Sequence, residues 1–269
     1  MFYLTPYLFA LAMPMIIQIL AAVIPAVFLV VWIWKKDTVE KESPGLIISL
    51  LICGVISTFC AVVTELIGGL ILGPLQKTGL LYAVLMNFLV VGLSEEGFKY
   101  LFLKVRTWKN PEFNYRFDAI VYAVCVSLGF ALFENIQYVM QYGLGTAASR
   151  AVPAVPGHAC FAVFMGIWYG QAKMCEARGD RSGARLNRIL AVVIPVLAHG
   201  AYDLFASFGD AMTVVFVVFI ILVFLLAFRA VKKSSLTDAP IPGQSGPGGY
   251  PGGGPGMYGG SGGWGGPSR

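Results

Sequence analysis

The sequence is poor in charge, poor in histidine and without a cysteine pairing pattern, and each scarcity excludes a class of protein. Only 12% of the 269 residues are charged and 57% are hydrophobic, whereas a soluble domain carries about 25% charged residues. The composition therefore predicts a polytopic membrane protein. The five cysteines have no paired spacing, which argues against a disulfide framework or a structural zinc site. A His-Glu-x-x-His motif is also absent.

Seven apolar runs are long enough to cross a bilayer, which takes about 20 helical residues. They occupy residues 7–34, 44–73, 80–103, 118–141, 157–175, 189–207 and 211–230. The first run has no basic segment before it and no cleavage site promptly after it, so we expect a retained span and not a signal peptide. The predicted fold is all-α, a bundle of about seven transmembrane helices.

Lysine and arginine gather in alternate loops. Loops 35–42, 104–117 and 173–188 and the segment 229–233 hold fifteen basic residues, whereas the opposite loops hold only Lys77 and Arg150. This asymmetry is typical of cytoplasmic loops of a membrane protein, so we expect the lipid bilayer and no nucleic acid as a partner. It predicts an integral protein of the plasma (cytoplasmic) membrane, with the N-terminus outside and the C-terminus in the cytoplasm.

The chain divides into two expected regions. Residues 1–233 form the membrane domain and residues 234–269 form a tail. From Pro240 onward the tail consists largely of Gly, Pro, Ser and Tyr. Such a composition cannot bury a core, so we expect a disordered cytoplasmic tail.

The third span carries the stretch Ser94-Glu95-Glu96-Gly97-Phe98-Lys99. An ionisable side chain near the middle of a spanning helix costs about 2.5–3.5 kcal/mol on insertion scales, and such groups usually line a polar cavity. On a helix Lys99 lies at i+4 from Glu95 and at i+3 from Glu96, while the two glutamates diverge by about 100°. We expect one glutamate to pair with Lys99 and the other to face elsewhere.

Three further spans each carry one polar group. The fourth holds Glu134 and, one turn later, Tyr138, and the fifth begins near His158. The sixth holds His199 and Asp203, which share a helical face because they lie at i and i+4. These are the only two histidines of the chain. Polar groups on four consecutive spans predict one shared, water-filled pocket.

Small residues and a further glutamate mark helix contacts. Small residues recur at four-residue spacing in the fourth span, which predicts close approach of a neighbouring helix; they are Ala119, Ala123, Ser127 and Ala131, with Gly129 nearby. Glu65 in the second span precedes two glycines. We interpret Glu65 as a pore-facing or interhelical hydrogen-bonding side chain.

The polar inventory suits hydrolysis in two ways, and the residues alone leave both open. A glutamate can act as general base toward water, with a histidine or tyrosine stabilising the oxyanion. Alternatively, a divalent metal such as zinc would suit a ligand set of two histidines and carboxylates; its candidate ligands are Glu95, Glu134, His158 and His199. Helix rise places Glu95, Glu96 and His199 near the bilayer centre and the other groups about two turns further out, an offset that helix tilt has to absorb.

The four motifs together, in this order, resemble those of the PrsW family of membrane-embedded proteases, whose distant relatives are the CAAX-processing and bacteriocin-processing (Abi) membrane proteases. They are Glu-Glu-x-x-Lys at 95–99, Phe-Glu-x-x-x-Tyr at 133–138, Gly-His-Ala at 157–159 and His-x-x-x-Asp at 199–203. The likeness covers residues 80–208. It implies an intramembrane endopeptidase that cleaves a membrane-anchored protein, such as an anti-sigma factor, on its extracytoplasmic side.

The resemblance also implies residue roles. The expected catalytic residues are Glu95, Glu96, Glu134, His158 and His199, with Lys99, Tyr138 and Asp203 in support. The alternative from a different class is a proton- or ion-coupled transporter, for which intramembrane acids and imidazoles are equally expected. A relative that binds partners without chemistry is disfavoured because all four motifs are complete.

Overall fold

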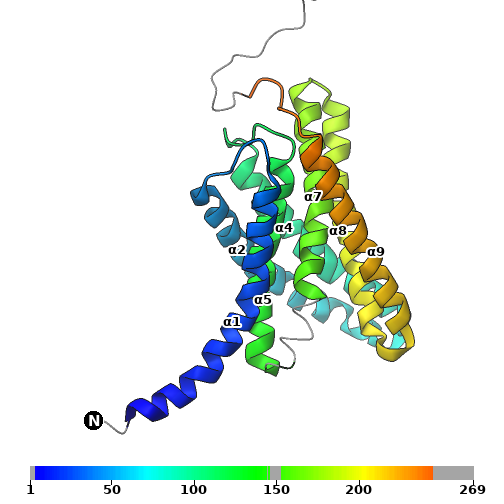
Figure 1. Cartoon of the computed structure of the whole chain (residues 1–269). Coiled ribbons are helices and arrows are strands. Elements are labelled where there is room, and N and C mark those ends of the chain that lie inside the picture. The colour runs from blue at the N-terminus through cyan, green and yellow to red at the C-terminus, as the bar shows by residue number, and fades with distance from the viewer. Residues whose placement is uncertain (1–3, 144, 146–152, 245–269) are drawn as a thin grey trace, which may run out of the picture.

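The structure is a computed structural model that describes residues 4–143, 145 and 153–244, and these residues form a bundle of helices (Figure 1). Its main helices are α1 (Leu4–Lys36), α2 (Pro44–Leu72), α4 (Leu93–Thr107), α5 (Asp118–Tyr142), α7 (Ala154–Ala177), α8 (Arg181–Ser207) and α9 (Thr213–Leu236). Shorter elements join them, namely η1 (Gly73–Thr78), α3 (Leu80–Val84), η2 (Leu85–Gly92) and η3 (Gly209–Met212). The predicted all-α membrane bundle is confirmed.

Helix α5 is the centre of the bundle. It packs against α1, α2, α4 and α7, and its residues from Asp118 to Ala131 are all buried. A helix that is apolar all round belongs inside a bundle, and the sequence of α5 has this property. Because this part of α5 is enclosed, Asp118 at its first residue lies inside the protein and not in lipid.

Glycines set the distance between α5 and its neighbours. A Cβ on Gly54 would lie 2.0 Å from the backbone oxygen of Val126, and one on Gly129 would lie 2.1 Å from that of Leu51, so α2 and α5 touch along their backbones. On the other side, a Cβ on Gly166 would lie 2.5 Å from Cα of Ile120. The close approach predicted from the small residues of the fourth span is confirmed.

The third span is not a uniform α-helix. Its middle, η2, is an eight-residue π-helix that ends where Leu93 begins α4. A Cβ on Gly200 of α8 would lie 2.5 Å from the Phe88 ring, and one on Gly92 would lie 3.2 Å from the backbone oxygen of Val196. Local π-helical geometry is frequent at functional sites. Here η2 and its glycine contacts bring the start of α4 directly against α8.

Six helical segments of the described chain are long and apolar enough to cross a membrane. They include every predicted span except residues 157–175. That region does form a helix of 24 residues, α7, but most of its side chains are buried against α5, α8 and α9. Because α7 faces protein and not lipid, its sequence can be less hydrophobic than those of its neighbours.

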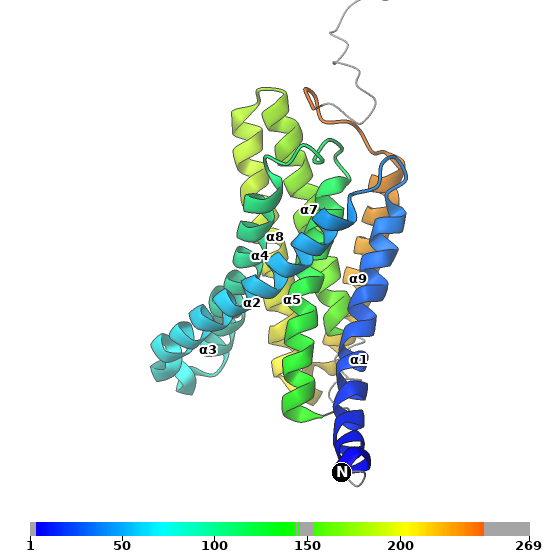
Figure 2. The same cartoon turned by 90° about the vertical axis from the view of Figure 1, so that its left-hand side faces the viewer.

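The four basic segments lie at one end of the bundle (Figure 1). Figure 2 shows α2 running obliquely across the upright α5, with α3 to one side of the bundle. The expected boundary at residue 233 falls inside α9. Residues 237–244 then pack on the α4–α5 connection, where Ile241 is 1% exposed and its backbone N–H donates to the carbonyl oxygen of Asn114 at 2.7 Å. Residues 245–269 lie outside the described residues.

Candidate active site

Lys99 lies at the centre of a buried polar cluster. Its Nζ is 3.1 Å from Oε2 of Glu95, 2.7 Å from Oε1 of Glu96 and 3.1 Å from Nδ1 of His158. The ammonium has three protons and meets three acceptors. The expectation that only one glutamate pairs with Lys99 is wrong, because the long lysine side chain reaches both carboxylates from the next turn.

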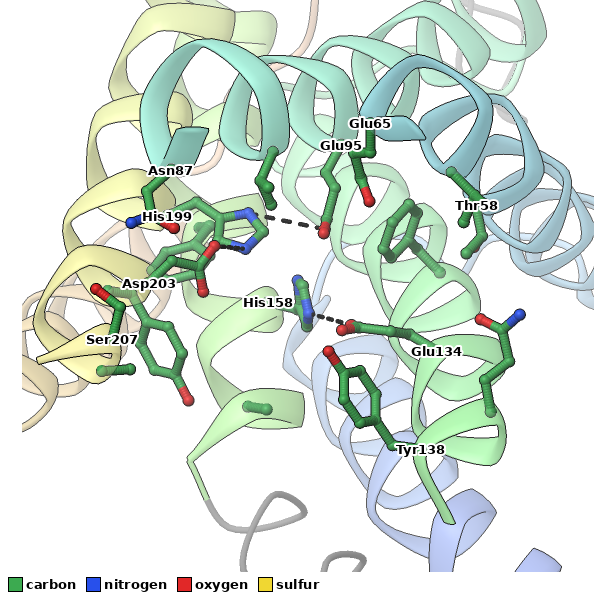
Figure 3. A pocket seen from close by; sticks show the side chains of 18 of the residues that line it. Thr58, Glu65, Asn87, Glu95, Glu134, Tyr138, His158, His199, Asp203 and Ser207 are labelled. Atoms are coloured by element: carbon green, nitrogen blue, oxygen red, sulfur yellow. Dashed lines mark hydrogen bonds and ion pairs between the residues drawn. The ribbon is translucent and has the colours of Figure 1, made fainter. Parts of the chain in front are cut away.

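The lysine contact fixes the tautomer of His158. Since Nδ1 accepts from Lys99, the ring proton is on Nε2, which lies 2.9 Å from Oε2 of Glu134. Glu134 comes from α5 and His158 from the first turns of α7. This hydrogen bond therefore joins two helices through residues that are 24 positions apart in the sequence. Figure 3 shows the Tyr138 hydroxyl on the same side of the cavity as the Glu134 carboxylate.

His199 lies between two carboxylates. Its Nδ1 is 2.9 Å from Oε1 of Glu96, and its Nε2 is 3.3 Å from Oδ2 of Asp203. Both ring nitrogens of His199 therefore face carboxylate oxygens. The ring stacks on Phe161 with centroids 5.1 Å apart, and the centroid of the His158 ring is also at 5.1 Å.

The cluster borders a cavity of about 600 Å³ between α2, η2, α4, α5, α7 and α8 (Figure 3). Seven of the eight predicted site residues are accounted for by direct contacts in the cluster, and Tyr138 lines the same cavity. The predicted convergence of four spans is therefore observed.

The two adjacent glutamates differ in their surroundings. Glu95 lines the cavity, whereas Glu96 is 0% exposed and lies behind it, where it contacts Lys99 and His199. The sequence treats the two alike because both fall in one motif. The difference arises from the packing of α4 against α8, which leaves the Glu95 carboxylate accessible to water in the cavity and buries that of Glu96.

Two further polar side chains line the cavity, Glu65 from α2 and Asn87 from η2. Figure 3 shows the Glu65 carboxylate beside that of Glu95. Glu65 was expected to face a pore or another helix, but it was not placed in the site. Its signal was the same as that of Glu95, an acid within an apolar span.

The donor set suits a metal. One ligand atom each of Glu95, Glu96, His158 and His199 lies within 4.8 Å of all the others, and two imidazoles with carboxylates are the donors of many catalytic zinc sites. Glu134 is joined to this group through His158. The Lys99 ammonium contacts three of these four residues, Glu95, Glu96 and His158, so a metal held by the same atoms would displace it.

Comparison of the sequence with known proteins identifies a family of membrane proteases. The family described as "PrsW family intramembrane metalloprotease" matches residues 42–228, from the start of α2 to α9. No solved structure matches the chain.

Three similar proteins each bear the name "Protease PrsW". The one from Shouchella clausii (strain KSM-K16) is 30% identical over 82% of this chain and 98% of its own length. That from Halalkalibacterium halodurans is 31% identical over 81% and 97%, and that from Clostridioides difficile (strain 630) is 32% identical over 68% and 76%. The family match decides between a transporter and a protease in favour of the latter. This chain belongs to the PrsW family of intramembrane metalloproteases.

Proposed function

We propose that the chain hydrolyses a peptide bond of a membrane-anchored protein, such as a single-span anti-sigma factor, inside the cavity described above. The observation that carries the proposal is the meeting of Glu95, His158 and His199 at one cavity, from three helices that are far apart in the sequence. Burying ionisable groups within a membrane costs free energy, and in a hydrolytic site each of these groups would have a catalytic or metal-binding role.

Glu95 is the proposed general base. Its carboxylate lines the cavity, and Lys99 holds Oε2 at 3.1 Å, so the side chain is fixed where water can reach it. In the proposed reaction Glu95 takes a proton from water while the water oxygen attacks the peptide carbonyl carbon. The carbon–nitrogen bond then breaks, and the leaving amine receives the proton from Glu95.

His199 is the proposed donor to the oxyanion. Its Nε2 lies 3.3 Å from Oδ2 of Asp203 at the cavity wall, and in the proposed step the proton between these two groups turns from the carboxylate to the carbonyl oxygen, where negative charge develops. Glu96 and Lys99 are positioning residues because they hold His199 and Glu95 and do not line the cavity themselves.

A divalent metal such as zinc belongs to this proposal, with Glu95, His158 and His199 as ligands and Glu96 or Glu134 completing the set. A bound metal of this kind would lower the pKa of a water ligand and polarise the carbonyl. With a metal bound, Glu95 and His199 would serve as its ligands and not as base and proton donor, and the remaining glutamates that line the cavity, Glu65 and Glu134, would be the candidates for the general base.

The cavity also suggests the side of cleavage. Glu134, His158 and Asp203 lie in the halves of their helices that are remote from the basic end of the bundle. If the basic end faces the cytoplasm, as the positive-inside rule predicts, the cavity lies in the extracytoplasmic half of the membrane. Cleavage would then occur on the outer side of the substrate.

The test is cleavage of a single-span membrane protein by the purified chain in liposomes. We expect Glu95→Gln to lower kcat by about 10²–10⁴-fold, the usual contribution of a general base. The matched control is Glu176→Gln, an exposed acid of α7 whose partner is Arg188, and it should cleave like the parent. Activity that survives both Glu95→Gln and Glu96→Gln removes the carboxylate-base mechanism. Ion flux without cleavage, abolished by Glu134→Gln, supports the transporter instead.

A further inference from the structure

A second cluster of acids lies at the opposite end of the bundle, outside the cavity. Asp37 is in the α1–α2 connection, Glu42 comes just before α2, and Asp118 begins α5. One oxygen from each of these three carboxylates lies within 4.8 Å of the other two. The three residues are 1%, 4% and 1% exposed, so this is not a solvated acidic surface.

In each of the three carboxylates, the hydrogen bonds from the described residues reach only one of the two oxygens. Asp118 Oδ2 accepts from the backbone N–H groups of Asn114 and Tyr115 at 3.0 and 2.7 Å, and Glu42 Oε2 accepts from the Tyr122 hydroxyl at 2.7 Å. One oxygen of Glu42 and one of Asp118 lie within 4.8 Å of each other. Two ionised carboxylates at this distance repel each other unless a proton or a cation lies between them.

The strongest sign of a missing ligand is Asp37. Its Oδ1 lies 3.3 and 3.4 Å from the backbone nitrogens of Val39 and Glu40, whereas its Oδ2 is buried and accepts no hydrogen bond from the residues that the structure describes. The amide oxygen of Asn114, 3% exposed, is also buried without a partner. Buried oxygens without partners are rare in proteins, and a bound ion or water is one way to satisfy them.

The chain's own cations do not supply that ligand. Within the described part of the chain, no lysine, arginine or histidine side chain forms an ion pair with the three carboxylates. The nearby Lys41 ammonium donates to the backbone oxygens of Trp34 and Asp37. The three carboxylates therefore have no counter-ion among the described residues.

We propose that Asp37, Glu42 and Asp118 bind a hard divalent cation, Ca²⁺ or Mg²⁺, that ties the α1–α2 connection to the start of α5. Carboxylate and amide oxygens are the ligands that these ions prefer, and the cluster offers no nitrogen or sulfur donor. The site would be structural, because it lies at the basic end of the bundle, away from the cavity (Figures 1 and 2). It is independent of the proposed peptidase mechanism.

Terbium luminescence can test the site, because Tb³⁺ substitutes for Ca²⁺ and is sensitised by nearby aromatic rings. The Tyr122 hydroxyl and the Trp34 indole N–H both hydrogen-bond to Glu42. We expect the purified full-length chain to give sensitised emission that Ca²⁺ competes away, and Asp37→Asn to reduce it at least tenfold. The matched control Asp210→Asn removes an exposed acid of η3 and should keep the signal.

Glu95→Gln distinguishes this site from the cavity and should also keep the emission. Loss in Glu95→Gln with retention in Asp37→Asn, or no emission from the parent, overturns the proposal. Should Asp37→Asn fail to fold, thermal unfolding of the EDTA-treated Glu95→Gln chain tests whether the acidic cluster binds the cation. Ca²⁺ or Mg²⁺ at about a hundredfold above Kd should raise its Tm by about 5–10 °C, and an unchanged Tm refutes the site.

Discussion

Replacing Lys99 by methionine tests the buried cluster most directly. Methionine keeps most of the volume of the side chain and removes only the ammonium, which now meets Glu95, Glu96 and His158 at 2.7–3.1 Å. The variant leaves two carboxylates, 6% and 0% exposed, without their shared counter-ion. Breaking a buried ion pair from one side costs about 3–5 kcal/mol.

This cost should be visible in thermal unfolding. A change of 1 kcal/mol shifts Tm by roughly 2–4 °C in a protein of 150–250 residues, so Lys99→Met should lower Tm by about 6–20 °C. The measurement is Trp fluorescence of the chain in detergent micelles as a function of temperature. Lys232→Met, which removes an exposed lysine near the end of α9, is the control and should stay within about 0.5 kcal/mol of the parent.

A double-mutant cycle tests whether Lys99 and Glu96 stabilise each other. Glu96→Gln removes one of the two negative charges that Lys99 neutralises, so adding it to Lys99→Met should cost less than the sum of the single changes. We expect a coupling energy of about 1–3 kcal/mol. A Lys99→Met chain that unfolds with the parent, or a cycle with strictly additive effects, would show that the ammonium is not the counter-ion of these acids.

Two further predictions concern packing and metal. Gly129→Ala should destabilise the chain by about 1–3 kcal/mol in the same unfolding assay, because the new Cβ would lie 2.1 Å from the backbone oxygen of Leu51; Gly69→Ala, with nothing within 4 Å, is the control and should be neutral or stabilising. Removal of divalent metal with a zinc chelator should abolish cleavage in liposomes and zinc should restore it, whereas undiminished cleavage in the chelated sample would exclude the metal from the mechanism.

The motifs of the site could be predicted from the sequence because ionisable residues within apolar runs stand out. Glu95, Glu134, His158 and His199 were found in this way, and the structure brings them together although up to 104 positions separate them. Their common depth could not be predicted. It depends on how α4 follows the π-helical η2 and packs against α8, and periodicity in the sequence does not report this packing.

The roles within the site were harder to predict for a related reason. Glu95 and Glu96 are neighbours of the same type, and their difference arises only when Gly92 and Gly200 let η2 and α4 pack against α8. The sequence identifies Glu65 as an acid within an apolar span, but nothing in that span predicts that its side chain lines the same cavity. Long-range packing, and not local pattern, decides both cases.

The burial of α7 also bears on how the chain enters the membrane. Insertion machinery sorts each segment by its own hydrophobicity, and α7 carries His158, Lys173 and Glu176. Six segments of the described chain can partition into lipid individually, whereas α7 does not meet that standard. It is expected to insert as a hairpin with α8, which follows it after a short turn at Gly179. Placement of His158 in the membrane would then depend on synthesis of the helix that comes next.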